Sequence, residues 1–339
     1  MTIPRPLTTA ILVPFLAACF AAGAFASKPM LRFHSDGSFK IVQFTDVHDN
    51  AEIDPRTVAA MDGILDSEKP DFVVVTGDLV ETNRCKTPDD LKRAVAHIAE
   101  PMEARGVAWA VTLGNHDEDN LSQIGVSKYE MLAMYMKYPH NINKKSPREV
   151  FGAGNANLLI NGSTSGKPAF GIWLLDSNAY TPGEINGQKI GLYDWVTQVK
   201  WYWDKSVALE KRNGRKIDSL MFFHIPLREY DDLRNSKKFT GEADEDFGPG
   251  VLNSGLFAAA LERGDVRGIF AGHAHLTTIV GDWYGIKLGC SGSIGYQAYG
   301  FDNKPDAERN RLRGARVFTL KEKDPANFAT RFVTADSLK

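Results

Sequence analysis

The amino-acid sequence predicts an α/β protein built around a largely parallel sheet, on three observations. Short apolar runs rich in β-branched residues alternate with amphipathic stretches of helical spacing, as in successive strand–helix–strand units. Polar clusters follow several of these runs at their carboxyl ends, where open α/β sheets bind their ligands. No Pro- or Ser-rich linker divides residues 27–339, so we expect a single domain over that range.

The individual elements follow from their hydrophobic patterns. The run Asp71–Thr76 is almost continuously apolar and β-branched, as expected of a strand covered on both faces. Apolar residues recur at helical spacing over 54–68 and 87–105, and Thr87 with Asp90 forms a capping-box pattern. The expected strands are 41–44, 71–76, 107–113, 170–175, 219–223, 266–270, 316–320 and 330–333; the expected helices are 54–68, 87–105, 128–138, 193–212 and 253–263.

Two long segments interrupt this pattern. Residues 118–169 contain one amphipathic stretch followed by Gly- and Asn-rich sequence, which we interpret as loops. Residues 228–250 are polar, with seven acidic and four basic side chains, and lie between an expected strand and an expected helix. Long irregular loops inside a compact domain are often functional. For 228–250 both a substrate lid and a solvated surface loop are open interpretations.

Residues 1–26 have the three regions of a secretory signal peptide. Arg5 is followed by an almost wholly apolar run, which ends in small residues at Ala24 and Ala26. We therefore expect cleavage after Ala26 and export to the periplasm or the medium, with no membrane span in the mature chain.

Two alternatives to cleavage after Ala26 remain open. The segment Leu16-Ala17-Ala18-Cys19 resembles a lipobox, so lipidation at Cys19 is the second interpretation. A retained anchor helix is the third, although the apolar run is short and contains Pro14 and Gly23.

The charge balance argues against a nucleic-acid-binding protein, and the cysteine content argues against a disulfide-rich one. Lys and Arg total 40 against 42 Asp and Glu, a formal charge of −2, so nucleic acid is not an expected partner. The mature chain would retain Cys85 and Cys290, too few for a disulfide scaffold. Either a single bridge or two independent buried thiols fits the sequence.

Five polar clusters at strand ends carry the candidate chemistry. They are Asp46-Val47-His48, Gly77-Asp78, Gly114-Asn115-His116-Asp117, His224 and Gly272-His273-Ala274-His275. An Asp and a His two positions apart on an extended backbone point the same way and reach one ion. Together the clusters supply carboxylate, imidazole and amide ligands of the kind that bind divalent transition metals. About seven or eight ligands exceed the needs of one ion and suit two ions that share a carboxylate.

In this order and context the clusters resemble the calcineurin-like metallophosphoesterase superfamily. Further motifs are similar to short plant and fungal purple-acid-phosphatase-like proteins and their bacterial relatives. These motifs are 109–117, Phe223-His224-Ile225-Pro226-Leu227, 263–266, 295–300 and Arg313-Gly314-Ala315-Arg316-Val317. The resemblance implies a four-layer α/β/β/α sandwich over residues 27–339, in which two central sheets are flanked by helices.

Carried onto this sequence, the resemblance implies two metal sites that share Asp78. The first would use Asp46, His48, Asp78 and His275, and the second Asp78, Asn115, His224 and His273. Iron, manganese and zinc all accept such ligands. His116 would act as general acid or as a donor to the phosphoryl oxygens, and Asp117 either orients His116 or is a turn residue.

One position departs from the coloured members of the family. True purple acid phosphatases have an iron-bound Tyr in a G-D-x-x-Y motif, whereas this chain has Glu81 at that position. We therefore expect an iron-loaded protein to lack the purple absorption band.

The sequence thus predicts a dimetal-dependent phosphoric ester hydrolase. A hydroxide between the ions would attack phosphorus in line, with His116 as general acid. A small-molecule or protein phosphomonoester is the expected substrate. A phosphodiesterase using the same site and a catalytically silent metal-binding or interaction protein are the alternatives.

Overall fold

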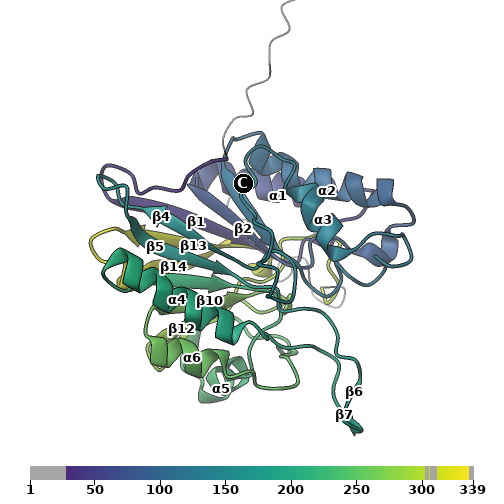
Figure 1. Cartoon of the computed structure of the whole chain (residues 1–339). Coiled ribbons are helices and arrows are strands. Elements are labelled where there is room, and N and C mark those ends of the chain that lie inside the picture. The colour runs from purple at the N-terminus through teal and green to yellow at the C-terminus, as the bar shows by residue number, and fades with distance from the viewer. Residues whose placement is uncertain (1–27, 302–304, 306–310, 336–339) are drawn as a thin grey trace, which may run out of the picture.

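The computed structural model describes residues 28–301, 305 and 311–335, and these form four layers. Two β-sheets pack face to face, and helices cover the outer face of each (Figure 1). The predicted α/β/β/α sandwich is therefore confirmed. The expected signal peptide and the alternative at Cys19 lie outside the described residues.

The first sheet has five strands in the order β14-β13-β1-β2-β3. Strands β1, β2 and β3 are parallel, whereas β13 runs antiparallel to β1 and to β14. Their bounds are β1 Ser38–Phe44, β2 Phe72–Thr76, β3 Ala108–Thr112, β13 Gly314–Lys321 and β14 Ala329–Thr334.

The second sheet has seven strands in the order β4-β5-β8-β10-β12-β11-β9. Its centre, β5-β8-β10-β12, is parallel, and its edges are antiparallel. A separate hairpin, β6–β7, projects away from the body (Figure 1). The bounds are β4 Ala156–Asn161, β5 Pro168–Leu174, β6 Glu184–Ile185, β7 Gln188–Lys189, β8 Ser219–Phe222, β9 Phe239–Thr240, β10 Val266–Ala271, β11 Val280–Trp283 and β12 Ile286–Cys290.

Three helices cover each sheet. Helices α1, α2 and α3 pack on the first sheet, and α4, α5 and α6 on the second. The predicted capping box is present, because Thr87 accepts from the Asp90 amide and Asp90 accepts from the Thr87 amide. The bounds are α1 Pro55–Glu68, α2 Pro88–Glu103, α3 Lys128–Tyr135, α4 Val199–Asn213, α5 Glu229–Ser236 and α6 Leu256–Arg263, with short 3₁₀ turns at Thr82–Arg84 and Pro325–Asn327.

Strand alternation divides the core into three apolar layers. In β2, Val73 and Val75 face helices α1–α3, whereas Phe72 and Val74 face the other sheet. In β8, Phe222 faces the first sheet and Met221 faces helices α4–α6. Because both faces of these strands are covered, their sequences are continuously apolar, as predicted.

Three predicted segments differ from the structure. Helix α4 begins at Val199 rather than at residue 193, because the preceding residues form the base of the projecting hairpin. The polar segment 228–250 is not a continuous loop: it contains α5 and β9, and Tyr230 and Leu233 of α5 are buried. Strand β4 lies in the 118–169 segment, where its alternating burial was masked by the surrounding Gly and Asn.

The two cysteines are free thiols in different layers. Cys85 is buried beside helices α1–α3, and Cys290 is buried on the opposite side of the molecule beside α4–α6. A bridge between them is therefore excluded, and the alternative of two independent buried thiols is confirmed. Among the described residues, no helix is both long and apolar enough to cross a membrane.

Candidate metal centre

The predicted clusters meet where the parallel strands of both sheets end. Each of β1, β2, β3, β8 and β10 is followed directly by one cluster. Six of the seven predicted ligands are almost completely buried: Asp46, His48, Asp78, Asn115, His224 and His275. Residues separated by up to 229 positions in the chain therefore share one site.

The carboxylates and imidazoles form two groups that share Asp78. Ligand atoms of Asp46, His48, Asp78 and His275 lie within 4.8 Å of one another, as do those of Asp78, His224 and His273. Asp78 accepts the backbone N–H of His116 at Oδ1 (2.8 Å), so its Oδ2 faces both groups. The family resemblance implies the same residues, with Asn115 as a further member of the second set.

Three histidines are oriented by a hydrogen bond on the far side of the ring. Nδ1 of His224 donates to the Thr76 carbonyl (2.9 Å), and Nδ1 of His275 donates to the Tyr299 carbonyl (3.0 Å). Nδ1 of His48 lies 3.0 Å from Glu81 Oε2. With Nδ1 engaged, each ring presents Nε2 to the centre, as histidine ligands of metals do.

Several ligand atoms of the two groups face one another at short distance. Nε2 of His224 lies 3.0 Å from Asp78 Oδ2, and Nε2 of His48 lies 3.1 Å from that of His275. Asp78 Oδ2 and Asn115 Oδ1 are both buried without a hydrogen-bond donor. Buried acceptors without a donor are costly unless a cation satisfies them, so this crowded set of oxygen and nitrogen ligands fits two metal ions.

The close packing of these buried groups shifts their pKa values. Burial alone would lower the pKa of His224, but the Asp78 carboxylate raises it to about 9. Burial and the neighbouring His224 lower the pKa of His273 to about 3. The flanking imidazoles outweigh burial at Asp78 and hold its pKa well below the ordinary value. Asp78 is therefore an anion, which is the form a shared ligand requires.

The backbone at the ligands is left-handed rather than extended, contrary to expectation. The φ angles are 51° at Asp46, 49° at His48, 47° at Asp78 and 72° at His273. Such values are uncommon for residues other than glycine and concentrate at functional sites. Sharp turns after the strands, rather than strand alternation, therefore bring Asp46 and His48 together.

Two glycines make room for this packing. A Cβ on Gly77 would lie 2.4 Å from the His224 ring, and one on Gly114 would lie 2.3 Å from Asp78 Oδ1. Gly77 also has φ +81°, which other residues rarely adopt. Glycine is therefore needed in each of these two motifs, because the backbone there passes too close to a candidate ligand for any side chain.

His116 lies beside the two groups and is oriented by Asp119. Its Nδ1 is 2.7 Å from Asp119 Oδ2 and 3.6 Å from Glu81 Oε1. Burial would lower the pKa of His116, but the Asp119 hydrogen bond and the charges of Asp78 and Glu81 raise it to about 9. The imidazole is thus available as a proton donor.

Of the two roles left open for Asp117, the structure shows the turn residue and not the residue that orients His116. The Asp117 carboxylate is buried and accepts the backbone N–H groups of Val80 (2.8 Å), Gly114 (2.8 Å) and Leu79 (3.3 Å). It ties together the two loops that follow β2 and β3. Asp119, three residues after His116 in a turn, was missed because its sequence context shows no strand-end pattern.

Glu81 occupies the place that tyrosine takes in the coloured relatives. It lies between His48 and His116, with one oxygen toward each ring. The absence of the purple band stays a prediction, supported by this placement of a carboxylate rather than a phenol.

Three tyrosines border the centre, two of which carried no sequence signal. Asn115 Nδ2 donates to the Tyr180 hydroxyl (3.0 Å), and the Tyr193 ring contacts His273 edge-on at 4.5 Å between centroids. The Tyr299 ring lies 4.4 Å from that of His275. Tyr180 and Tyr193 belong to the projecting hairpin, so only folding reveals that they contact Asn115 and His273.

The three histidines outside the clusters are not part of the centre. His34 pairs with Asp71, His97 with Asp49 and His140 with Glu103, at 2.5, 3.1 and 2.8 Å. Each is a histidine–carboxylate pair, and none of the three belongs to a group of candidate ligands.

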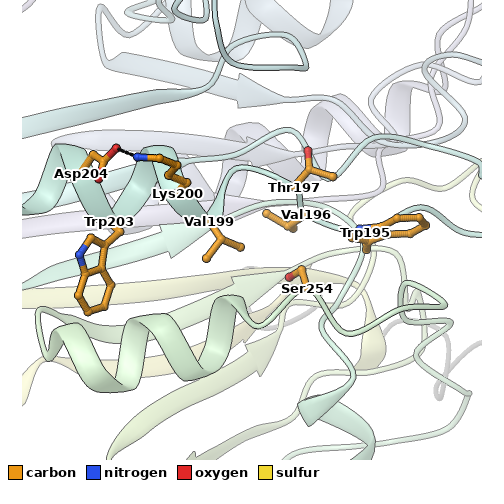
Figure 2. Close-up of a pocket in the computed structure, with 8 residues that line it drawn as sticks. All are labelled: Trp195, Val196, Thr197, Val199, Lys200, Trp203, Asp204 and Ser254. Atoms are coloured by element: carbon orange, nitrogen blue, oxygen red, sulfur yellow. Dashed lines mark hydrogen bonds and ion pairs between the residues drawn. The ribbon is translucent and has the colours of Figure 1, made fainter.

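A separate surface hollow of about 690 Å³ lies over the start of α4. Figure 2 shows its apolar wall of Trp195, Val199 and Trp203, and the ion pair between Lys200 and Asp204 on its rim. None of its lining residues is a candidate ligand, so the hollow is distinct from the metal centre.

Comparison with known proteins agrees with this geometry. The calcineurin-like phosphoesterase family model matches residues 39–276. "Probable inactive purple acid phosphatase 14" of Arabidopsis thaliana is 31% identical and covers 87% of this chain and 80% of its own. "Phosphatase DCR2" of Saccharomyces cerevisiae is 29% identical over 71% of this chain and 44% of its own.

Solved structures share the fold at low identity. A dimetal phosphatase from Danio rerio matches 84% of this chain and 93% of its own with a TM-score of 0.51 at 15% identity. GAP50, described as the anchor in the inner membrane complex of Plasmodium, matches 89% of this chain and 86% of its own with a TM-score of 0.53 at 11% identity.

Proposed function

Because the chain belongs to the calcineurin-like phosphoesterase family, we propose that it is a dimetal-dependent phosphoric ester hydrolase acting on phosphomonoesters. The observation that carries the proposal is the pair of buried ligand groups joined by Asp78. Two groups sharing one carboxylate are the arrangement of two-metal hydrolytic sites.

The chain's own residues would divide the work as follows. Asp46, His48 and His275 would hold one ion, His224, His273 and Asn115 would hold the other, and Asp78 would serve both. When bound, the two ions supply positive charge to the phosphoryl group and lower the pKa of water toward neutrality. Glu81 and the Thr76 carbonyl keep the His48 and His224 rings aimed at the centre.

His116 supplies the proton that the leaving oxygen requires. The Asp119 carboxylate holds the proton on Nδ1 and fixes the ring, so Nε2 is the atom that faces the substrate. Nε2 lies 3.3 Å from the Tyr299 hydroxyl, and the two form a hydrogen bond. A bound substrate would take the place of the Tyr299 hydroxyl as the partner of Nε2. A positioned acid of this kind contributes about 10²- to 10⁴-fold to rate.

One finding favours a second candidate, a metal-binding protein without catalysis. The Arabidopsis relative is named as probably inactive. Against that candidate, this chain retains every implied ligand as well as His116 with its Asp119 partner.

Hydrolysis of 4-nitrophenyl phosphate and bis(4-nitrophenyl) phosphate tests the proposal. Protein stripped by chelator is compared with aliquots reloaded with manganese, iron or zinc, and Asp78→Asn serves as the control for contaminating phosphatase. Metal-dependent cleavage of the monoester is expected. Faster cleavage of the diester would replace the monoesterase assignment by a diesterase. Two bound ions without cleavage of either ester would establish the silent alternative.

We also propose that the chain is exported, on the basis of Arg5 and the apolar run before Ala26. The intact mass of the exported protein should correspond to a chain that begins at Ser27. A diacylglycerol mass on Cys19 would contradict this and establish a lipoprotein.

A further inference from the structure

Two half-exposed tyrosines contact neighbouring residues of one loop: Tyr299 contacts His116, the residue that would face the leaving group, and Tyr180 contacts Asn115. Tyr180 and Tyr299 have 39% and 50% of their surface exposed. The Tyr299 hydroxyl lies 3.3 Å from His116 Nε2, and the Tyr299 ring lies edge-on to His116 at 5.7 Å between centroids. The Tyr180 hydroxyl accepts from Nδ2 of Asn115, the residue before His116.

The base of the projecting hairpin holds Tyr180 in place. The hairpin arm, residues 180–193, closes with a Tyr180–Tyr193 bridge and a Thr181 to Leu192 hydrogen bond of 2.9 Å. The rings of Tyr180 and Tyr193 stack at 6.0 Å with an interplanar angle of 27°. Because Tyr193 also contacts His273, the position of Tyr180 is fixed relative to the metal centre.

The candidate ligand His275 fixes Tyr299 in a similar way. His275 Nδ1 donates to the Tyr299 backbone carbonyl (3.0 Å), and the Tyr299 ring packs on the rings of His275 and His48. Both tyrosines are therefore positioned through residues of the centre while their rings remain accessible. Tyr284, which is 71% exposed, differs: it lies in the turn between β11 and β12 and its ring contact is with Trp283.

We propose that Tyr180 and Tyr299 are specificity residues that bind an aromatic leaving group, so the preferred substrates are phosphomonoesters whose alcohol carries an aromatic ring. This inference rests on the proposed hydrolase function. A leaving oxygen that accepts a proton from His116 places its organic substituent beside these rings. Aromatic pairs interact more strongly than contact area alone explains, which corresponds to about 2- to 12-fold in affinity per pair.

The test compares esters that differ only in aromaticity. 2-Phenylethyl phosphate and 2-cyclohexylethyl phosphate have primary alcohol leaving groups of matched basicity and similar size. For the metal-loaded full chain we expect kcat/KM to favour the phenyl ester by at least about fivefold. Tyr180→Leu and Tyr299→Leu should each reduce that ratio, whereas Tyr180→Phe and Tyr299→Phe should retain it, and Tyr284→Leu is the matched surface control.

A binding measurement separates the inference from the hydrolase function. Calorimetry with the metal-loaded protein should show phenylphosphonate bound more tightly than cyclohexylphosphonate, with the same loss of preference in the two Leu variants. Equal kcat/KM for the two esters, or a preference that survives both Leu substitutions, would overturn the role of the tyrosines while leaving hydrolysis intact. Absence of turnover with both esters, together with selective binding of the phenylphosphonate, would overturn the hydrolase function and support the tyrosine site.

Discussion

The candidate metal centre at the strand ends and the 180–193 arm lie side by side but differ in how they are held in place. The candidate ligands follow strands and are almost completely buried, and their positions are set by two packed sheets. The arm is a two-stranded hairpin that pairs with itself and projects from the body, and its residues 182–184 and 187–189 are exposed (Figure 1).

This difference assigns the reaction to the buried centre and the proposed substrate preference to the exposed arm. Catalysis tolerates only small displacements of the residues that hold the reacting groups, so metal ligands are best placed next to rigid elements of the core. A hairpin makes few buried contacts and tolerates change, as surface loops do. A substitution at Tyr180, at the base of the arm, is therefore expected to alter substrate preference without disturbing the ligands.

The largest expected effect is at the shared carboxylate. Asp78→Asn should abolish loading of two ions and lower monoesterase activity by about 1,000-fold or more, because the bridging charge is lost. Elemental analysis and hydrolysis assays measure both quantities, and Asp204→Asn on the α4 surface is the control. An Asp78→Asn protein that still held two ions would show that the two groups are not joined through this residue.

The next effect separates acid catalysis from metal binding within the centre. His116→Asn should lower turnover by roughly 100- to 10,000-fold while metal content stays unchanged. His34→Asn, far from the site, is the matched control. Loss of metal from the His116 variant would instead make His116 a ligand, together with its neighbours Glu81 and Asp119.

A smaller effect distinguishes two acids that are two positions apart. Asp119→Asn should reduce turnover by roughly tenfold with little change in thermal stability, since it orients His116. Asp117→Asn should lower the free energy of unfolding by about 1–3 kcal/mol, because an amide N–H would face a backbone N–H in a buried site. Thermal unfolding and kinetics together measure this contrast. The opposite assignment of the two effects would restore Asp117 as the orienting residue.

The smallest effect is expected at the tip of the arm. Replacing residues 184–189 by a short Gly-Ser linker should change the free energy of unfolding by less than about 1 kcal/mol and leave metal content intact. Hydrolysis of 4-nitrophenyl phosphate should stay within about twofold, because Tyr180 and Tyr193 are retained. A large loss of stability would mean that the arm supports the core, and the contrast between the two regions would fail.

Elements that are buried on both faces could be predicted from the sequence more readily than elements with one partly exposed face. Strands such as β2 and β8 are covered on both faces, so continuous apolar runs revealed them. Strand β4 and helix α5 were missed because each has one exposed face and lies in polar or Gly-rich sequence. The arm was missed for the same reason, and its base residues were assigned to the start of the following helix.

By itself the sequence determined which strands carry a motif at their carboxyl end and which candidate ligand types each motif offers. Those follow from hydrophobic pattern and from the chemistry of Asp, Asn and His. Only the tertiary structure decided which acid orients His116, that Cys85 and Cys290 lie apart, and that Tyr180 borders the centre. The physical reason is that these facts depend on distances between segments far apart in the chain, which local pattern does not encode. Asp117 and Asp119 look alike in sequence, and the turn after β3 alone directs one to the backbone and the other to the imidazole.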